Sequence, residues 1–285
     1  MKPAAFKYWR ARNADEAIAL AAAAGDEVRF LAGGQSLVPM MNFRIARPST
    51  IVDLGECSDL AIVRPDDRSI RIGAMVRQRD AASDALLREH CPLVCEALEH
   101  AGPLTVRNRA TVGGSVANAY PLAQLTCALI ALDASVVLHS PTRRRTLPVA
   151  DFLIDAMVTA IEPGELLQEI IVPCRARGER QAFREAGNHA GGAALAIACG
   201  TVSSASDGSI TDARIAVSGV AGRPLRLAAV ELAVKENADA DRLRAAFLRD
   251  VHVDSTNDAT LDDAQSLAVV VISDLVDALC SSAHE

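Results

Sequence analysis

Two glycine pairs are the segments of this chain whose residue types could bind a charged group. Residues 31–39 read LAGGQSLVP and residues 110–118 read ATVGGSVAN. Glycine has no Cβ, so the main chain there can approach a ligand closely and can adopt positive φ. Successive N–H groups in such turns form a concavity that binds anions, and Ser36, Thr111 or Ser115 could donate further hydrogen bonds to a phosphate. The two segments could close on a diphosphate from opposite sides, although Gly-Gly pairs also occur in ordinary turns.

Other patterns that carry out nucleotide or hydrolytic chemistry are missing from the sequence. Neither glycine pair belongs to a GxGxxG or a GxxxxGK[ST] pattern, which argues against a Rossmann NAD site and a P-loop ATPase. The six histidines share no metal-ligand spacing. We find neither a Ser-His-Asp arrangement nor paired carboxylates at a useful spacing. We therefore predict no catalytic residue and no metal-binding residue in this chain.

The cysteines point to packing rather than to chemistry. There are seven, an odd number, and no two of them form a CxxC pair. A disulfide framework, a zinc site or an iron–sulfur site is therefore not expected. We expect these side chains to be small buried hydrophobic groups.

Composition and charge exclude several classes of protein. The 285 residues carry 29 basic and 36 acidic side chains, a net charge of -7, which argues against a nucleic-acid binder and a polybasic membrane-surface protein. Half of the residues are hydrophobic, so the chain is not disordered. The charged N-terminus lacks the apolar stretch of a signal peptide, and no run of about 18 apolar residues could span a membrane. We expect a cytoplasmic protein.

The glycine pairs must be positioned by an α/β framework. Asn13 and Glu16 form a capping-box-like start of a helix that ends at Gly25. Strands are predicted at 28–32, 51–54, 60–63, 70–72, 136–139, 146–149, 166–172, around Arg184, at 194–202 and at 213–220. Helices are predicted at 78–87, 92–101, 122–132, 226–235, 241–247 and 262–279. The break PCRARGER at 173–180 predicts a domain boundary, and the chain divides into 1-55, 56-175 and 176-285.

Some charged and aromatic side chains allow two interpretations. Residues 143–145 are three consecutive arginines that either form a solvated turn or contact an acidic partner. Arg107 and Arg109 flank the second glycine pair and could neutralise phosphates or meet a partner. Tyr8 and Trp9 are expected to be core or interface anchors.

Three motifs together resemble the FAD-binding medium subunit of the molybdenum hydroxylases. These are AGGQSLVPMMNFRIARPSTIVDL at 32–54, RNRATVGGSVANAYP at 107–121 and EPGELL at 162–167. The family includes bacterial carbon monoxide dehydrogenase, the N-heteroaromatic hydroxylases and the middle segment of xanthine dehydrogenase. The resemblance covers at least residues 6–173 and extends more loosely into the tail.

The resemblance implies an α+β protein with the vanillyl-alcohol-oxidase-like (PCMH-type) FAD fold. Two α/β subdomains would enclose FAD, and a C-terminal α+β domain would cover the flavin ring. The first glycine segment would cradle the diphosphate, the second would contact it, and Arg184 would place positive charge beside the flavin. The residues that the resemblance assigns to FAD binding are Leu31, Ala32, Gly33, Gly34, Gln35, Ser36, Leu37, Ala110, Thr111, Val112, Gly113, Gly114, Ser115, Asn118, Gln124, Leu166 and Arg184.

The resemblance also implies a function as one subunit of a larger enzyme. A small subunit with two [2Fe-2S] clusters would deliver electrons to the FAD, and an external acceptor would remove them. A large subunit with molybdopterin would hydroxylate a substrate, which we expect to be an N-heteroaromatic compound. The assembly would be a dimer of heterotrimers. The alternatives are a self-standing FAD-dependent oxidase or dehydrogenase and a non-enzymatic module with purely structural glycine turns.

The chain departs from the family pattern at several positions, three of which concern the cofactor site. Tyr120 and Gln124 stand where acidic residues are common, and a Gln can bond a ribose hydroxyl but brings no charge. Ala193 stands where some relatives have an aromatic residue on the flavin. We therefore expect a more open ring face than in those relatives.

Overall fold

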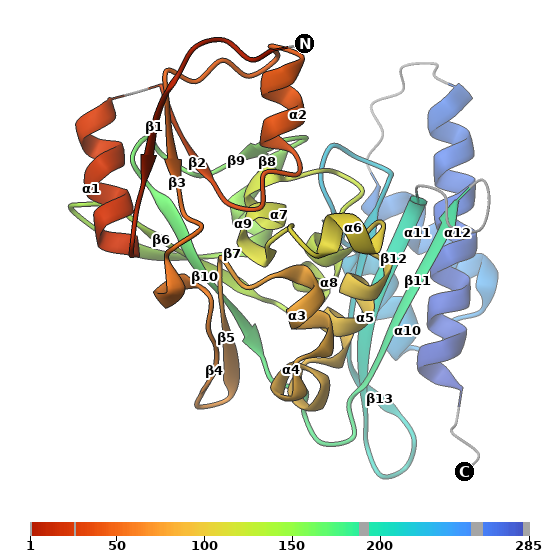
Figure 1. Cartoon of the computed structure of the whole chain (residues 1–285). Helices are drawn as coiled ribbons and strands as arrows, with labels where there is room; N and C mark the ends of the chain where they lie inside the picture. The colour runs from red at the N-terminus through yellow and green to blue at the C-terminus, as the bar shows by residue number, and fades with distance from the viewer. Residues whose placement is uncertain (1, 26, 188–193, 252–258, 282–285) are drawn as a thin grey trace.

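A computed structural model describes residues 2–25, 27–187, 194–251 and 259–281, with residues 259–262 described by their backbone alone. Its strands form a three-stranded, a five-stranded, a four-stranded and a two-stranded sheet. Figure 1 shows the three larger sheets side by side in chain order, with the N-terminal sheet at one end and the C-terminal helices at the other. Each of these three sheets is built from a different one of the ranges 1-55, 56-175 and 176-285. No helix in the described ranges is long and apolar enough to cross a membrane.

The N-terminal sheet is parallel and has the order β1-β3-β2. Its strands are β1 (Lys7–Arg10), β2 (Val28–Leu31) and β3 (Thr50–Asp53), and β1 is a strand that the sequence analysis missed. The predicted first helix is confirmed as α1 (Ala14–Ala24), because the Asn13 side chain accepts a hydrogen bond from the Glu16 amide at its start. Trp9 packs on this core, as expected, whereas Tyr8 is 45% exposed and its role as an interface anchor stays a prediction.

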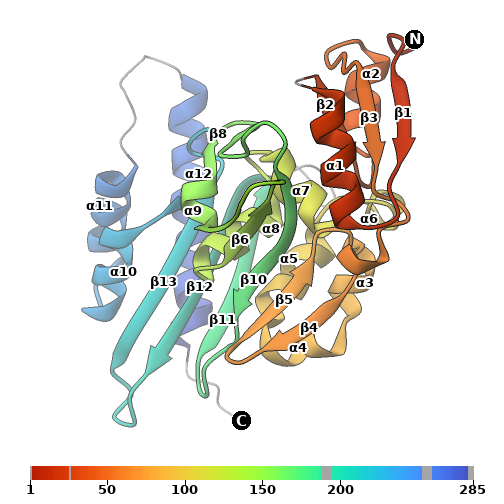
Figure 2. The ribbon, with the colours of Figure 1, turned by 90° about the vertical axis from the view of Figure 1, so that its left-hand side faces the viewer.

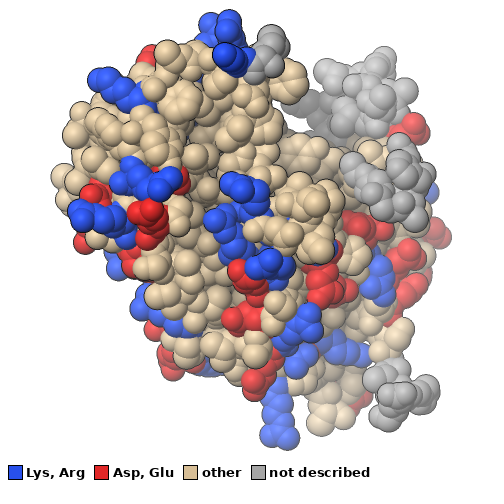
Figure 3. Space-filling model, viewed as in Figure 1, with Lys and Arg blue, Asp and Glu red and all other residues tan. Residues whose placement is uncertain are grey.

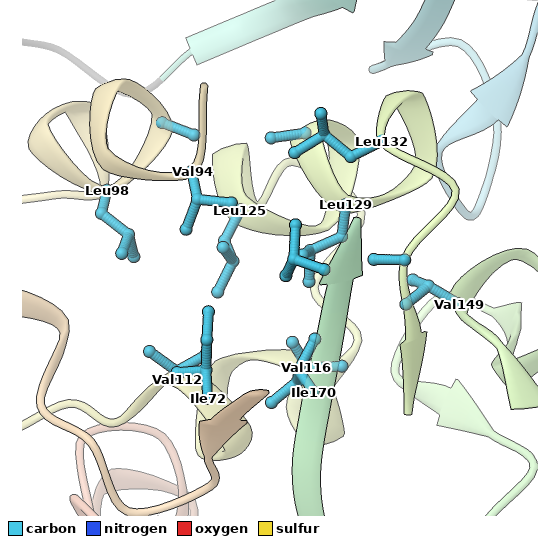
Figure 4. Packing of buried hydrophobic residues seen from close by; sticks show 14 of the residues in the cluster. Ile72, Val94, Leu98, Val112, Val116, Leu125, Leu129, Leu132, Val149 and Ile170 are labelled. Atoms are coloured by element: carbon cyan, nitrogen blue, oxygen red, sulfur yellow. The ribbon is translucent and has the colours of Figure 1, made fainter. Parts of the chain in front are cut away.

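The middle sheet has the order β4-β5-β10-β6-β7 and is antiparallel throughout. The strands are β4 (Val63–Asp66), β5 (Ser69–Gly73), β6 (Ser135–His139), β7 (Arg144–Pro148) and β10 (Leu166–Pro173). One face is covered by helices, among them α3 (Gln78–Ser83), α4 (Ala85–His90), α5 (Pro92–His100), α7 (Val112–Asn118) and α8 (Gln124–Ala131). Figure 4 shows Ile72 and Ile170 of the sheet facing Val116, Leu125 and Leu129 of the helices.

Two predicted elements of the middle region are wrong in their bounds. The strand predicted at 60–63 begins only at Val63, because Leu60 is buried in a 3-10 turn, η1 (Ser58–Leu60). The helix predicted at 78–87 is interrupted at Asp84, whose extended backbone ends α3 and whose side chain accepts from the Leu87 amide to start α4. A capping side chain inside an apolar pattern therefore divides one predicted helix into two.

The C-terminal sheet is antiparallel and packs between two layers of helices. Its strands are β11 (Arg180–Gly187), β12 (Ala194–Ser204), β13 (Ile210–Ser218) and β14 (Leu225–Arg226). The helices of the outer layer are α10 (Ala228–Lys235), α11 (Ala240–Asp250) and α12 (Ala259–Cys280). The other face shares a core with α5 and α8, since Phe183, Ile197 and Cys199 belong to the same buried cluster as Leu98 and Leu129.

Short elements complete the fold. They are α2 (Leu37–Asn42), α6 (Leu104–Arg107), α9 (Val149–Phe152), β8 (Leu153–Asp155) and β9 (Val158–Thr159). The helix α2 leads from the first glycine segment to the same end of the molecule as the N-terminus (Figure 1). Figure 2 shows the face of the middle sheet that points away from its helices.

Candidate cofactor-binding site

The first glycine segment, residues 32–36, is a loop that joins β2 to α2 and has unused hydrogen-bond donors. Gly34 has φ of +73°, which a side chain would disfavour. Within the described part of the chain, the amides of residues 33–36 have no hydrogen-bond acceptor. Gly33 is buried, and a buried N–H is nearly always paired. The Ser36 hydroxyl also makes no capping bond to α2. This loop is therefore built to receive an acceptor from outside the chain.

The second glycine segment, residues 111–115, is not the turn that the sequence predicts. It is the first turn of α7, and Thr111 caps this helix by accepting from the Gly114 amide at 3.0 Å. The Val112 amide donates to Val76 O at 2.9 Å and the Gly113 amide donates to Ala74 O at 3.0 Å. Most donors of this segment are therefore already used, in contrast to those of the first.

The glycines of the second segment serve close packing. A Cβ on Gly113 would lie 2.4 Å from the Ala74 Cβ, and one on Gly114 would lie 2.8 Å from the Thr111 Oγ1. Gly113 is fully inside the protein, and Val112 and Thr111 are 0% and 1% exposed. Gly114 and Ser115 remain partly accessible. Gly114 and Ser115 are thus the residues of this segment that a ligand could reach.

The structure brings the two glycine segments into contact. A Cβ on Gly33 would lie 2.2 Å from Arg109 O and 2.8 Å from the Ala110 Cα, so only glycine fits at this position. A Cβ on Gly114 would lie 3.5 Å from the Ala32 Cβ. The loop with free amides therefore faces the N-terminal end of α7. This is the arrangement that could hold a diphosphate between the two segments.

Four further predicted residues border the segments. Leu31 ends β2 and accepts from the Leu54 amide at 2.9 Å, whereas Leu37 is the first residue of α2. Ala110 accepts from the Gln78 amide at 2.9 Å, which holds the entry to α7, and Asn118 is the last residue of that helix. All four are partly accessible. Their positions fit a supporting role around the two segments.

Gln124 lies at the junction of the middle and C-terminal sheets. Its Nε2 donates to Glu185 Oε2 at 3.1 Å, and Glu185 Oε1 lies 2.8 Å from His100 Nδ1. This network connects α8, β11 and α5. In the part of the chain that the structure describes, no hydrogen bond joins Gln124 to either glycine segment. Its contact with a ribose stays a prediction.

Arg184 lies on β11, opposite Ala198 of β12. Its Nη1 donates to Phe183 O at 2.7 Å. Burial raises the pKa of Glu96 on α5, and the positive charge of Arg184 opposes this rise. Arg184 therefore places its charge beside Glu96. Ala193, which the sequence analysis singled out, lies outside the described residues.

Leu166 is buried in β10 and joins the cluster that contains α1 and β3. The preceding Glu165 accepts from Arg145 Nε at 2.8 Å and from the Glu162 amide at 2.9 Å. Burial alone would raise the pKa of Glu165, but these hydrogen bonds hold it below its ordinary value. The EPGELL segment is thus fixed by ion pairs, and Leu166 connects the first and second sheets.

The arginines at 143–145 have partners within the chain, and Arg144 and Arg145 lie in β7 rather than in a turn, whereas their contact with a partner subunit stays a prediction. Arg143 and Arg145 pair with Glu162 and Glu165. Arg144 pairs with Glu169 at 2.7 Å on the opposite side of β7. Strand alternation sends consecutive side chains to opposite faces, where separate carboxylates receive them.

Arg107 is also used within the protein. Its Nη1 donates to Glu99 O at 2.6 Å and to Leu98 O at 3.1 Å, so it caps the C-terminus of α5. The Arg107 side chain is therefore held at α5, whereas Arg109 is exposed beside Gly33.

The supporting groups of the site were missed by the sequence analysis. The carbonyls of Ala74 and Val76, which accept from the second segment, follow β5 in a stretch with no motif. The Ala74 amide in turn donates to Gln168 O of β10 at 2.9 Å. The small size of Ala74 opposite Gly113 was the one available signal, and it becomes meaningful only when the two are known to touch.

The cysteines behave as expected from the sequence. All seven are free, and five of them are buried. Burial raises the pKa of Cys57 and Cys95 to about 11, so neither thiol is a ready nucleophile. Among the described residues, no group of three His, Cys, Asp or Glu side chains could hold a metal ion.

Comparisons with known proteins agree with this geometry. A family model described as the FAD binding domain in molybdopterin dehydrogenase matches residues 4–175, which include both glycine segments. The chain is 37% identical over 226 residues to the 6-hydroxypseudooxynicotine dehydrogenase complex subunit alpha of Paenarthrobacter nicotinovorans, covering 79% of this chain and 76% of the relative. It is 34% identical over 285 residues to the caffeine dehydrogenase subunit beta of Pseudomonas sp. (strain CBB1), covering 96% and 94%.

The fold is also that of a solved relative. The carbon monoxide dehydrogenase from Hydrogenophaga pseudoflava that lacks the Mo-pyranopterin moiety contains a chain that superposes with a TM-score of 0.90. The two chains are 30% identical, and the match covers 98% of each. This confirms the expected α+β FAD-binding fold over the C-terminal region as well as over residues 4–175. The chain belongs to the family of FAD-binding medium subunits of molybdenum hydroxylase-type dehydrogenases.

Proposed function

We propose that this chain holds FAD between its two glycine segments and passes electrons from a partner subunit to an external acceptor. The observation that carries the proposal is that the loop 32–36, whose amides have no acceptor, lies against the start of α7, whose amides are hydrogen-bonded within the protein. Gly33 touches Arg109 and Ala110, and the amides of residues 33–36 point to no acceptor in the described chain. A diphosphate supplies the negatively charged oxygens that such donors require. When bound, FAD supplies the capacity to accept electrons singly or in pairs.

The residues of the two glycine segments would have different roles in binding FAD. The amides of residues 33–36 and the Ser36 hydroxyl would donate to the diphosphate. Gly114 and Ser115 would contact it from the second segment, since they are the accessible residues there. Val112 and Gly113 would act by keeping α7 fixed against Ala74 and Val76.

The opposite end of the site would place charge beside the flavin ring. Arg184 holds a positive charge between β11 and α5, and Gln124 is positioned by Glu185. We propose that Arg184 stabilises negative charge near the ring and that Gln124 bonds a cofactor hydroxyl. This division of the chain follows the ranges 1-55, 56-175 and 176-285, with the ring at the junction of the last two.

The proposed complex contains a large molybdopterin subunit and a small subunit with two [2Fe-2S] clusters, as a dimer of heterotrimers in the cytoplasm. We propose an N-heteroaromatic substrate for it. Two relatives are named for 6-hydroxypseudooxynicotine and caffeine, both of which contain nitrogen heterocycles. A relative named carbon monoxide dehydrogenase medium chain is 34% identical over 226 residues, so carbon monoxide is the competing substrate class.

The test is a visible spectrum of the chain purified together with its partner subunits, followed by acid release of the flavin. The proposal expects one FAD per chain, iron–sulfur absorbance from the other subunits, and bleaching of the flavin when a substrate is added to the complex. Bleaching and turnover by the isolated chain would instead support a self-standing oxidase or dehydrogenase. A colourless chain that takes up no added FAD would overturn both and leave the glycine segments with a structural role.

A further inference from the structure

The tip of the N-terminal sheet exposes several large hydrophobic side chains on one surface. Phe43 and Ile45, just after α2, are 66% and 73% exposed, and Phe6 and Val38 are 39% and 42% exposed. Phe6 and Val38 line a small cavity of about 130 Å³ together with Pro3 and Met41. We call this surface, formed by residues 2–7 and 38–47, the apolar tip. Exposed apolar side chains gathered around one short helix are a candidate interaction site in a soluble protein.

The apolar tip is a built structure, because its backbone is fixed by hydrogen bonds. The Ile45 amide donates to Met40 O at 2.9 Å, and the Arg44 amide donates to Met41 O at 2.9 Å. Arg44 has φ of 59°, and its Nε donates to Lys2 O at 3.2 Å, which ties this turn to the N-terminal segment. Phe43 and Ile45 therefore point outward from a strained turn. Their exposed positions contribute no packing to the described core.

The tip is positively charged within an acidic protein. From residue 28 to residue 52 the sequence contains three arginines and neither Asp nor Glu, although the whole chain has a net charge of -7. Lys2, Lys7, Arg44 and Arg47 are exposed, and none of the ion pairs between described residues involves them. Glu27, just before β2, is an exposed acid near this end of the parallel sheet. Figure 3 shows Lys and Arg at the top of the molecule, over α2 and the N-terminus, beside uncharged surface.

We propose that the apolar tip is the docking surface for a partner subunit that presents apolar side chains bordered by carboxylates. The exposed hydrophobic residues would supply the buried centre of the interface, and the four cations would form a rim that pairs with the partner's acids. A basic and apolar surface also suits anionic lipid. A protein partner is favoured because Phe43 and Ile45 stand on a fixed turn beside a preformed cavity. The inference rests on the proposed assembly, but it does not depend on flavin binding.

The test measures association of the full chain with its purified partner subunits by sedimentation velocity. The double variant Phe43→Ser/Ile45→Ser removes the apolar centre. The matched control is Leu232→Ser/Leu248→Ser, since these two leucines are 54% and 51% exposed on α10 and α11. The tip variant is expected to raise the dissociation constant about tenfold or more, while the control stays near wild type. Thermal unfolding of each variant alone checks that the surface changes leave the fold intact.

A second variant tests the charged rim. Lys7→Gln/Arg47→Gln should weaken association at low salt and reduce its dependence on salt concentration. Wild-type association by the Phe43→Ser/Ile45→Ser variant would overturn the proposal. So would a wild-type chain that dimerises through the tip by itself. Binding to phosphatidylglycerol vesicles that is lost in the variant, with subunit association unchanged, would assign the tip to lipid and overturn it as well.

The two proposals fail in different ways. FAD content is measured on every preparation by acid release. An assembled complex without flavin would contradict the proposed function and leave the docking surface standing. Normal FAD content together with unchanged subunit association in the Phe43→Ser/Ile45→Ser variant would contradict the docking surface and leave the proposed function standing.

Discussion

The two glycine segments have nearly the same sequence pattern and do different physical work. In the first, residues 33–36 leave their amides without acceptors, and Gly34 takes a left-handed conformation. In the second, the amides of Val112, Gly113 and Gly114 are bonded within the protein. Gly113 is there because α7 packs directly against Ala74, and a Cβ on Gly114 would meet the Thr111 hydroxyl. A Gly-Gly pair can thus provide donors for a ligand or space for a helix.

The contrast explains why neither segment suffices alone. A loop with free amides needs a rigid opposing surface, because a binding site gains affinity when its groups are held in place before the ligand arrives. The second segment supplies that surface through Thr111 and through the carbonyls of Ala74 and Val76. Gly33 is the point of contact between the two.

The largest effect is expected from Gly113→Ala. The added Cβ would lie 2.4 Å from the Ala74 Cβ and 2.6 Å from the Ala74 Cα, so the backbone must shift. Overpacking of this kind costs about 1–3 kcal/mol of unfolding free energy. Chemical denaturation of the apoprotein measures the loss, with Ser115→Ala on the same helix as the control. An unchanged stability would show that α7 is not braced as described.

The next largest effects are expected from removing one hydroxyl in each glycine segment, which distinguishes a structural role from a role in FAD binding. Thr111→Ala removes the cap of α7 and should lower the unfolding free energy by about 1 kcal/mol. Ser36→Ala removes a hydroxyl that makes no capping bond, so stability should be unchanged while FAD dissociates more readily. Denaturation and fluorescence titration with FAD measure both quantities for both variants. Equal stability losses, or equal affinity losses, would erase the distinction between the segments.

Two glycines at positive φ separate the effect on ligand binding from the effect of backbone strain. Gly34→Ala and Gly25→Ala each place a side chain at positive φ, +73° and +84°, and should each cost about 1 kcal/mol of stability. Nothing lies within 4 Å of a Cβ on Gly25, whereas Gly34 lies in the donor loop. Only Gly34→Ala should weaken FAD binding. A similar loss of affinity in Gly25→Ala would mean that general destabilisation, not the loop, controls binding.

Low pH should destabilise the packing around the second glycine segment and leave the first segment unaffected. The pKa values of Glu165, just before β10, and of Glu169, on β10, are held below the ordinary 4.5, because hydrogen bonds from arginines outweigh burial. Their stabilising effect is therefore present above pH 4.5 and lost as the pH falls through the lowered pKa. The β10 carbonyl of Gln168 holds Ala74, which in turn holds Gly113. In Glu165→Gln, the unfolding free energy should decrease less than in the wild type as the pH falls below 4.5. The same decrease with pH in the variant and the wild type would contradict this role of Glu165.

The sequence predicted most of the fold from local signals. The Asn13 cap, the strand before Gly33 and the apolar pattern of α12 are short-range features, and the structure confirms them. The bounds at Leu60 and Asp84 were wrong because burial and capping depend on neighbours that a pattern does not show. The edge strand β1 was missed because its alternation is too short to detect.

The site was predictable only in part. Both glycine segments were found from their residues, but the sequence gives no sign of which one has free amides. That difference arises from Ala74 and Val76, far along the chain from Gly113, and becomes visible only when the sheet has formed. The arginines at 143–145 show the same limit, since their partners Glu162, Glu165 and Glu169 lie on or just before β10, which the chain reaches through a long connection.

Amide hydrogen exchange at single-residue resolution tests the central claim most directly. It is followed by NMR on the apoprotein and again after saturation with FAD. The account predicts fast exchange at residues 33–36 in the apoprotein and strong protection when FAD is bound, because free donors gain acceptors. The amides of Val112 and Gly113 should exchange slowly in both states. Protection of residues 33–36 without FAD, or no change there when FAD binds, would contradict the assignment of the donor loop.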